Sequence, residues 1–157
     1  MVDCKIFFIV LLFYSNEIKG QKIKKIKYKK MRSKKFATAI NCMDGRVQLP
    51  IIEWLKKKYK VDFVDMITEP GPNKILAKGK DKLLIKSIKE RTEISVKKHF
   101  SNLIALVGHT NCAGNPVKKR KQLEEIIKSV EIIKSWNLNA KTIGLWVNGK
   151  WEVERII

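Results

Sequence analysis

Leu103-Ile104-Ala105-Leu106-Val107 leads directly into Gly108-His109-Thr110-Asn111-Cys112, and this stretch decides the fold. Five consecutive aliphatic residues without alternation are typical of a strand buried on both faces, as in a parallel sheet. Earlier in the chain, the apolar run Phe36-Ala37-Thr38-Ala39-Ile40 leads in the same way into Asn41-Cys42-Met43-Asp44-Gly45-Arg46. Thiol, imidazole and carboxylate groups therefore follow two predicted strands at their carboxyl ends.

The carboxyl ends of parallel strands meet at one edge of a sheet, where open α/β folds build their sites. Cys42, His109 and Cys112 would there supply three zinc ligands and leave a fourth position open. An open position is typical of a catalytic zinc, since structural sites are usually closed by four protein ligands. A single cysteine behind a strand is more often a small buried apolar residue, so the prediction depends on the combination.

The two segments resemble those of the β-class carbonic anhydrases. That family has Cys-x-Asp-x-Arg after its first core strand and Gly-His-x-x-Cys after a later one, which here read Cys42–Arg46 and Gly108–Cys112. The resemblance covers residues 34–157. It implies that Cys42, His109 and Cys112 bind Zn²⁺, and that Asp44 and Arg46 form a catalytic carboxylate–guanidinium pair beside the metal.

The resemblance also implies an activity, the zinc-dependent reversible hydration of carbon dioxide to bicarbonate. Zinc lowers the pKa of its bound water to about 7 in carbonic anhydrases, and the resulting hydroxide would attack the carbon of carbon dioxide. Asp44 would accept a hydrogen bond from the zinc-bound water, and Arg46 would hold Asp44 ionised through a bidentate pair. In the related family this aspartate can also bind zinc itself and close the site, an alternative that the spacing leaves open.

Two further functions stay open. One is the hydrolysis of a related heterocumulene such as carbonyl sulfide or carbon disulfide, and the other is a non-catalytic zinc-binding or interaction domain. The presence of both Asp44 and Arg46 favours an enzyme, because neither is needed merely to hold zinc. The segment Thr68-Glu69-Pro70-Gly71-Pro72-Asn73 stands where the family has Arg-Asn-Ala-Gly, which favours a changed substrate or the non-catalytic alternative.

The remaining pattern alternates between helices and strands. We expect a helix opening at Leu49–Pro50, a strand over 61–67, a loop at 70–72 and a Lys-rich helix or helix pair over 74–100 that breaks near Gly79. Asn115 would cap the next helix and Pro116 would open it. Its apolar stripe would consist of Leu123, Ile126, Ile127, Val130, Ile133 and Trp136.

The C-terminal residues predict a hairpin. A strand over 142–147 meets Asn148-Gly149, a two-residue turn signal, and residues 150–156 would return as the antiparallel partner. Strands that alternate with helices imply right-handed crossovers. The predicted fold is therefore a three-layer α/β domain with a mainly parallel sheet of about four to five strands, flanked by helices and finished by a C-terminal antiparallel edge hairpin.

The composition sets the N-terminal residues apart. The chain has 157 residues and a net charge of +19, and residues 1–35 alone carry 11 Lys/Arg against 2 acids. The apolar run Ile6–Tyr14 is too short for a bilayer span of about 20 residues, although it fits a signal-peptide core. Residues 1–30 have three alternative interpretations: a weak signal or anchor, a disordered extension, or an upstream start that precedes a true first residue at Met31. We favour the last two. We therefore expect a basic extension over 1–33 and a single zinc domain over 34–157.

The remaining expectations concern partners and compartment. A basic surface can bind nucleic acid or an anionic membrane, but no nucleic-acid module is evident, so we expect neither partner and interpret the lysines as solvated helix faces. The odd cysteine, Cys4, does not indicate a disulfide framework, and thiolate ligands suit a reducing, cytoplasmic setting, with export or anchoring through residues 1–20 as the alternative. We also expect a homodimer or larger oligomer, because the family assembles its sites near subunit interfaces.

Overall fold

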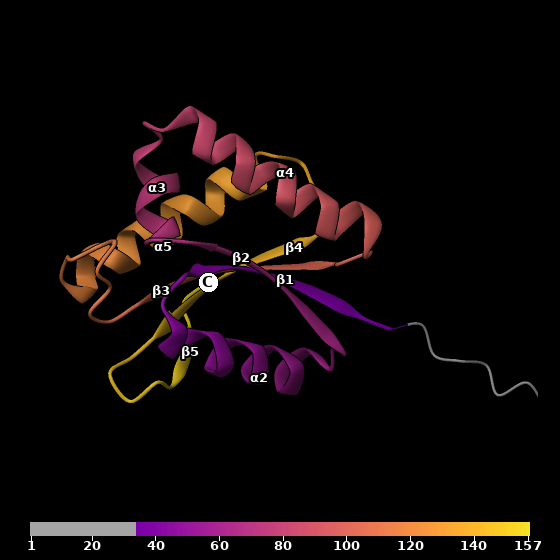
Figure 1. Cartoon of the computed structure of the whole chain (residues 1–157), viewed down its shortest axis with the longest axis horizontal. Coiled ribbons are helices and arrows are strands. Elements are labelled where there is room, and N and C mark those ends of the chain that lie inside the picture. The colour runs from indigo at the N-terminus through magenta and orange to yellow at the C-terminus, as the bar shows by residue number, and fades with distance from the viewer. Residues whose placement is uncertain (1–33) are drawn as a thin grey trace, which may run out of the picture. The chain divides into compact units, whose positions relative to one another are not determined.

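The computed structural model describes residues 34–157, so the predictions made for residues 1–33 lie outside the described residues. Residues Ser33–Ile157 make up one compact unit. In chain order its elements are β1 (Phe36–Cys42), the 3-10 helix η1 (Gly45–Val47), α2 (Gln48–Tyr59), β2 (Phe63–Glu69), α3 (Pro72–Lys78), α4 (Lys82–Lys98), β3 (Leu103–His109), α5 (Lys119–Lys134), β4 (Lys141–Val147) and β5 (Val153–Arg155) (Figure 1). None of the helices in this part of the chain is long and apolar enough to cross a membrane.

The five strands form one sheet in the order β2-β1-β3-β4-β5. The pairs β1–β2, β1–β3 and β3–β4 are parallel, and the last pair, β4–β5, is antiparallel. This arrangement confirms the predicted α/β fold with its mainly parallel sheet and its antiparallel C-terminal edge.

Helices cover both faces of the sheet. The chain moves in one direction from β1 to β2, and in the opposite direction from β2 past β1 to β3 and then to β4. Because parallel crossovers are right-handed, the reversal puts α2 on one face and α3, α4 and α5 on the other (Figure 1). The boundary between β1 and β3 is therefore a topological switch point, where open α/β sheets form their sites.

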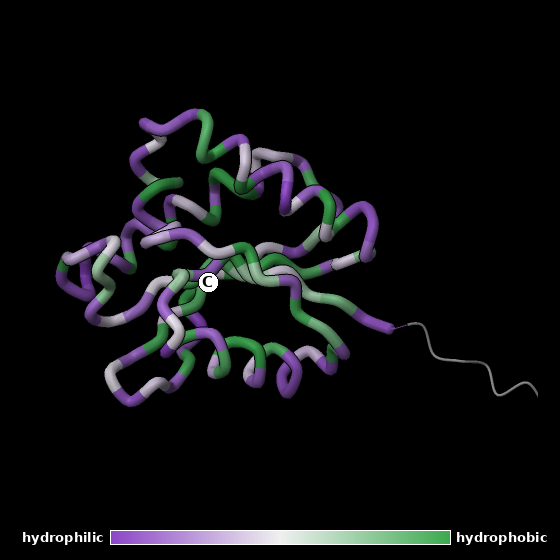
Figure 2. Tube along the Cα trace, viewed as in Figure 1, coloured by the Kyte–Doolittle hydropathy of each residue, from purple (hydrophilic) through white to green (hydrophobic). Residues whose placement is uncertain are grey.

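The core has two layers, one on each side of the sheet. On one side, Ala37, Ala39 and Ala105 belong to the same cluster of buried residues as Ile51 and Leu55 of α2. On the other side, the cluster contains the alternate strand residues Ile40, Ile104 and Leu106 together with Leu76, Ile88, Val130 and Ile133 of α3, α4 and α5. Figure 2 shows the apolar strands between helices whose outer faces are polar.

The predicted break near Gly79 separates two helices. Gly79 ends α3 in the left-handed conformation, with a φ of 66° and its N–H bonded to Ile75 O. Two residues later, the carboxylate of Asp81 accepts a hydrogen bond from Leu84 N at 2.9 Å and caps α4. A glycine that ends one helix and an aspartate that begins the next are the stop and start signals expected from sequence.

The predicted start of α5 is wrong. The helix begins at Lys119, after Lys118 as N-cap, and no side chain caps it. Asn115 is fully buried, and its amide Nδ2 donates to Glu125 Oε2 at 2.5 Å instead of capping a helix. The predicted stripe is also too wide, since Ile126, Val130 and Ile133 are buried whereas Ile127 is exposed.

The two-residue hairpin turn is wrong as well. Strand pairing stops at Val147 and Val153, so residues 148–152 form a longer loop. Asn148 organises this loop, because its Oδ1 accepts from Lys150 N at 2.8 Å and from Glu152 N at 3.1 Å. The left-handed residue in the loop is Trp151, with a φ of 64°.

Candidate metal centre

Cys42, His109 and Cys112 come together at the β1–β3 switch point. Cys42 ends β1, His109 ends β3 and Cys112 lies in the turn that follows β3. All three residues are buried, with relative exposures of 3%, 1% and 2%. Their possible ligand atoms all lie within 4.8 Å of one another. The structure therefore brings together the three residues that the sequence singled out as candidate ligands.

The geometry of the three residues fits a metal ion. The two Sγ atoms are 3.7 Å apart, and tetrahedral coordination with Zn–S bonds of about 2.3 Å would hold them about 3.8 Å apart. His109 Nδ1 lies 2.8 Å from Thr110 O, which can only accept, so Nδ1 carries the proton and Nε2 the free lone pair. That Nε2 is buried without a hydrogen-bond partner. An unpartnered buried acceptor beside two thiols is the donor set that zinc prefers.

The local charges favour a thiolate at Cys42. Its pKa is lowered to about 4, mainly because the Cys112 thiol donates to it, with help from the backbone N–H groups of Asp44 and Gly71. The pKa of Cys112 is raised, because it shares a proton with Cys42 and is buried. Backbone N–H groups of Gly114 and Asn115 nevertheless favour the thiolate form of Cys112. Amides directed at both sulfurs prepare the pocket for negative charge.

Asp44 and Arg46 form a bidentate pair beside this cluster. Arg46 Nε lies 2.9 Å from Asp44 Oδ1, and Nη2 lies 2.5 Å from Oδ2. The Asp44 carboxylate also accepts from the Arg46 backbone N–H at 3.0 Å, which fixes the first turn of η1. The hydrogen-bonded guanidinium lowers the pKa of Asp44 to about 2, so this carboxylate is ionised at neutral pH. Arg46 in turn lies over the Trp151 ring, with its Cζ 5.1 Å from the centroid.

Several residues that hold the site were missed by the sequence analysis. Gln48 Nε2 donates to Cys42 O at 2.6 Å and to Asp44 O at 3.0 Å, so it closes the turn between the ligand and the carboxylate. Asn41 Oδ1 accepts from Cys42 N at 2.9 Å. Trp151 reaches Arg46 from the distant β4–β5 loop. No signal in the sequence distinguishes these amides and this tryptophan from ordinary loop and helix residues.

The Pro-Gly-Pro loop after β2 also belongs to the site. The sequence predicts a loop at 70–72 without placing it, and the structure packs it against the turn that carries Cys112. A Cβ atom on Gly114 would lie 2.4 Å from Pro70 C and 2.8 Å from Gly71 N, so backbone meets backbone there. Gly71 has a φ of 69°, a conformation that favours glycine, and its N–H is directed at Cys42.

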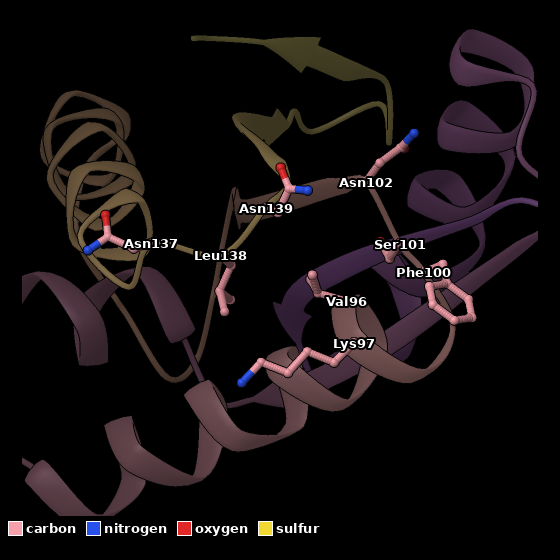
Figure 3. Close-up of a pocket in the computed structure, with 8 residues that line it drawn as sticks. All are labelled: Val96, Lys97, Phe100, Ser101, Asn102, Asn137, Leu138 and Asn139. Atoms are coloured by element: carbon pink, nitrogen blue, oxygen red, sulfur yellow. The ribbon is translucent and has the colours of Figure 1, made fainter.

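The cavity drawn in Figure 3 lies away from this site. It has a volume of about 520 Å³ and is lined by Val96, Lys97, Phe100, Ser101, Asn102, Asn137, Leu138 and Asn139. Ser101 and Asn102 precede β3, and Asn139 precedes β4, so the cavity lies at the opposite edge of the sheet. His99 is half-exposed near that edge, with its Nδ1 2.7 Å from Asp65 Oδ2.

Comparisons with known proteins agree with the sequence motifs. Residues 32–157 match the family described as "Putative carbonic anhydrase". The β-carbonic anhydrase isoform I of Trichomonas vaginalis has a similar structure, with a TM-score of 0.52, 14% identity, and coverage of 100% of this chain and 98% of that one. A tetrameric β-carbonic anhydrase of Sordaria macrospora has a TM-score of 0.44 and 13% identity, with coverage of 95% and 96%. No curated protein matches the chain in sequence.

The family match extends over nearly all the residues that the structure describes, from before β1 to the last residue. The likeness to the Trichomonas vaginalis enzyme shows the fold, because its identity to this chain is low. The buried Cys/His/Cys cluster lies at the carboxyl edge of that fold. The chain belongs to the carbonic anhydrase family, and its fold is that of a β-carbonic anhydrase.

Proposed function

We propose that this protein catalyses the reversible hydration of carbon dioxide to bicarbonate, with Zn²⁺ held by Cys42, His109 and Cys112. The observation that carries the proposal is the buried, unpartnered Nε2 of His109, which lies with two thiols beside an ionised carboxylate. A structural zinc site would need a fourth protein ligand. Among the described residues, the cluster contains only three His, Cys, Asp or Glu side chains.

Each residue has a role in this proposal. Zinc, when bound, supplies an acidified water as the nucleophile. Asp44 accepts a hydrogen bond from that water and orients it, because Arg46 keeps the carboxylate ionised and fixed by two parallel bonds. Gln48 fixes the backbone between Cys42 and Asp44, so the ligand and the acceptor keep a constant separation.

The proposal includes a second copy of the chain. Met43 and Leu49 flank Asp44 and Arg46 in the sequence and are 64% and 60% exposed. Large apolar side chains beside a site that needs to exclude water suit an interface, and a two-fold dimer is the commonest symmetric assembly. We propose that residues 34–157 form a single zinc domain. We also propose a reducing, cytoplasmic compartment, because such a compartment keeps two thiolate ligands from being oxidised.

Stopped-flow measurement of carbon dioxide hydration tests the proposal. Protein loaded with one zinc per chain should accelerate proton release far above the buffer rate, and the Cys112→Ala variant prepared in parallel should not. A folded, zinc-loaded protein that leaves the buffer rate unchanged would overturn the proposal. Release of hydrogen sulfide from carbonyl sulfide or carbon disulfide by that same preparation would instead assign it to the heterocumulene hydrolases.

A further inference from the structure

The buried face of α5 carries polar residues where apolar residues would be expected. Gln122 and Glu125 are 1% and 5% exposed, and both lie on the side of the helix that also buries Ile126. Glutamine and glutamate are rarely buried unless they are fully hydrogen-bonded. The partners of these two side chains therefore indicate why the helix carries them.

Gln122 bonds to both segments that carry ligands after β3. Its Nε2 donates to His109 O at 3.0 Å and to Asn115 O at 3.0 Å. Asn115 closes the turn that begins at Cys112, because its backbone N–H donates to Cys112 O at 3.1 Å. A single amide group thus links the backbone of His109 to the turn of Cys112.

Glu125 anchors the same turn through a second set of bonds. Its Oε2 accepts from Asn115 Nδ2 at 2.5 Å and from Asn73 Nδ2 at 3.4 Å. Asn73 also donates to Gln122 Oε1 at 2.9 Å, so Asn73, Asn115, Gln122 and Glu125 are linked in one hydrogen-bond network. Asn73 follows the loop whose Gly71 N–H is directed at Cys42. The network therefore reaches the surroundings of all three candidate ligands from a single helix.

Stability alone does not account for this network. Buried polar groups have to recover the cost of their desolvation, and apolar side chains of similar size often serve a core as well or better. Hydrogen bonds behind metal ligands have a different effect, since they fix the orientation of the ligands. Ser101 offers a comparison, because it is equally buried and hydrogen-bonded but precedes β3 at the opposite edge of the sheet.

We propose that Gln122 and Glu125 are positioning residues for metal binding: they hold His109 and the Cys112 turn in the arrangement that a metal ion requires. This inference rests on the metal site of the proposed function. Loss of such supporting bonds typically weakens metal affinity about 10- to 100-fold. Gln122→Met removes both donated bonds at nearly constant volume, and Asn115→Ala removes the Glu125 contact without altering α5. Glu125→Gln keeps an oxygen acceptor, whereas Glu125→Met has none.

The test compares these variants in the full chain with Ser101→Ala as the matched control. Zinc affinity is measured by competition with a chromophoric chelator, the ligand field by the visible spectrum of the cobalt(II)-substituted protein, and fold stability by urea unfolding of the metal-free protein. We expect Gln122→Met, Asn115→Ala and Glu125→Met to weaken zinc binding about 10- to 100-fold and to alter the cobalt spectrum. Glu125→Gln should restore both, and Ser101→Ala should lower only the stability.

The outcomes separate this inference from the proposed function. Wild-type zinc affinity and an unchanged cobalt spectrum in Asn115→Ala and Gln122→Met would overturn the inference, whatever the hydration rate. Wild-type protein that binds cobalt but does not hydrate carbon dioxide would overturn the proposed function, and the weakened variants would still support the inference. If Gln122→Met fails to fold, Asn115→Ala and the pair Glu125→Gln and Glu125→Met decide the result.

Discussion

At the scale of single residues, the sequence indicated the chemistry because that chemistry depends on residue type. Cys42, His109 and Cys112 could be singled out, since thiol and imidazole groups that directly follow two apolar strands together form a typical zinc donor set. Gln48 could not, because a glutamine near the start of a helix has no distinctive spacing. Its role depends on two backbone carbonyls that only the folded turn brings within reach.

Cys112→Ala should abolish stoichiometric zinc binding. The variant keeps a small apolar group at a buried position but removes one of two thiolates, so the remaining pair of ligands cannot hold the metal tightly. Metal analysis of purified protein should fall from about one zinc per chain to near zero. Alanine at Cys4, which lies outside the described residues, is the control and should leave the zinc content unchanged. Equal zinc content in both variants would contradict the ligand assignment.

Asp44→Asn should retain zinc and lose most of the hydration rate. The neutral amide is a weaker hydrogen-bond acceptor than the carboxylate that Arg46 keeps ionised. Loss of such a proton-accepting group typically lowers the reaction rate by a factor on the order of 10²–10⁴. Arg46→Ala should act in the same direction by releasing Asp44. Glu53→Gln, a charge-neutralising change on the exposed side of α2, is the control. Full turnover in both dyad variants, measured by stopped flow, would refute the catalytic role of the pair.

At the scale of elements, apolar periodicity predicted which segments are helices and strands, and polar contacts decided where they begin and end. The Lys-rich helices separated at Gly79 as expected, because a left-handed glycine is a local signal. α5 began four residues after Asn115, because that side chain bonds to Glu125 across the fold. A cap can be recognised from neighbouring residues, whereas a tertiary hydrogen bond cannot, so the start of α5 was beyond local reasoning.

Gly114→Ala should disrupt the contact between the two loops at the site. The new methyl group would lie 2.6 Å from Pro70 O and 2.8 Å from Gly71 N, and these backbone atoms can move only if the loop moves. Overpacking of this kind typically costs about 1–3 kcal/mol of unfolding free energy. Urea unfolding of the metal-free protein measures it.

Gly45→Ala is the matched control for that substitution. No atom lies within 4 Å of a Cβ placed on Gly45, although this glycine also belongs to the site, between Asp44 and Arg46. The control should therefore keep wild-type stability. Equal stability of the Gly114→Ala and Gly45→Ala variants would show that the loop contact is looser than the structure indicates.

At the scale of the whole molecule, the alternation of strands and helices predicted the α/β architecture. The right-handedness of the crossovers then determines which helices lie on which face of the sheet. The neighbouring positions of β1 and β3 agree with the expectation that the ends of these two strands supply ligands to one site. The part played by the Pro-Gly-Pro loop and by α5 around the metal site did not follow. These contacts join segments far apart in the sequence, and no local pattern encodes which surfaces meet.

A chain that starts at Met31 should fold and bind zinc like the full chain. The two core clusters and the candidate ligands all lie within residues 37–147. Urea unfolding midpoints and zinc content of the two proteins should agree. Aggregation of the shorter protein, under conditions where the full chain remains monodisperse, would show that residues 1–30 contribute to the domain or its assembly.

The protein should be a dimer or a larger oligomer in solution. Met43 and Leu49 are exposed and flank Asp44 and Arg46 in the sequence, and a second subunit packed against them would exclude water from the site. Salt at physiological strength screens the repulsion of the +19 charge beyond about 8 Å, so the charge does not prevent association. Light scattering at micromolar concentration should give at least twice the chain mass of 18.2 kDa. The double variant Met43→Lys with Leu49→Lys should shift the assembly toward monomer. A strictly monomeric wild type that hydrates carbon dioxide would refute the proposal that a second subunit shields the site.

The wide separation of the candidate ligands in the sequence affects when a metal ion can bind during folding. Cys42 and Cys112 are 70 residues apart in the chain, and the two sulfurs come together only when β1 pairs with β3 across the intervening α2, β2, α3 and α4. A metal ion would therefore find no complete site until this long-range pairing has formed, so we expect it to bind late in folding. Contacts absent from the transition state slow unfolding without accelerating folding. Bound zinc would thus slow the unfolding of the folded domain and leave its folding rate unchanged.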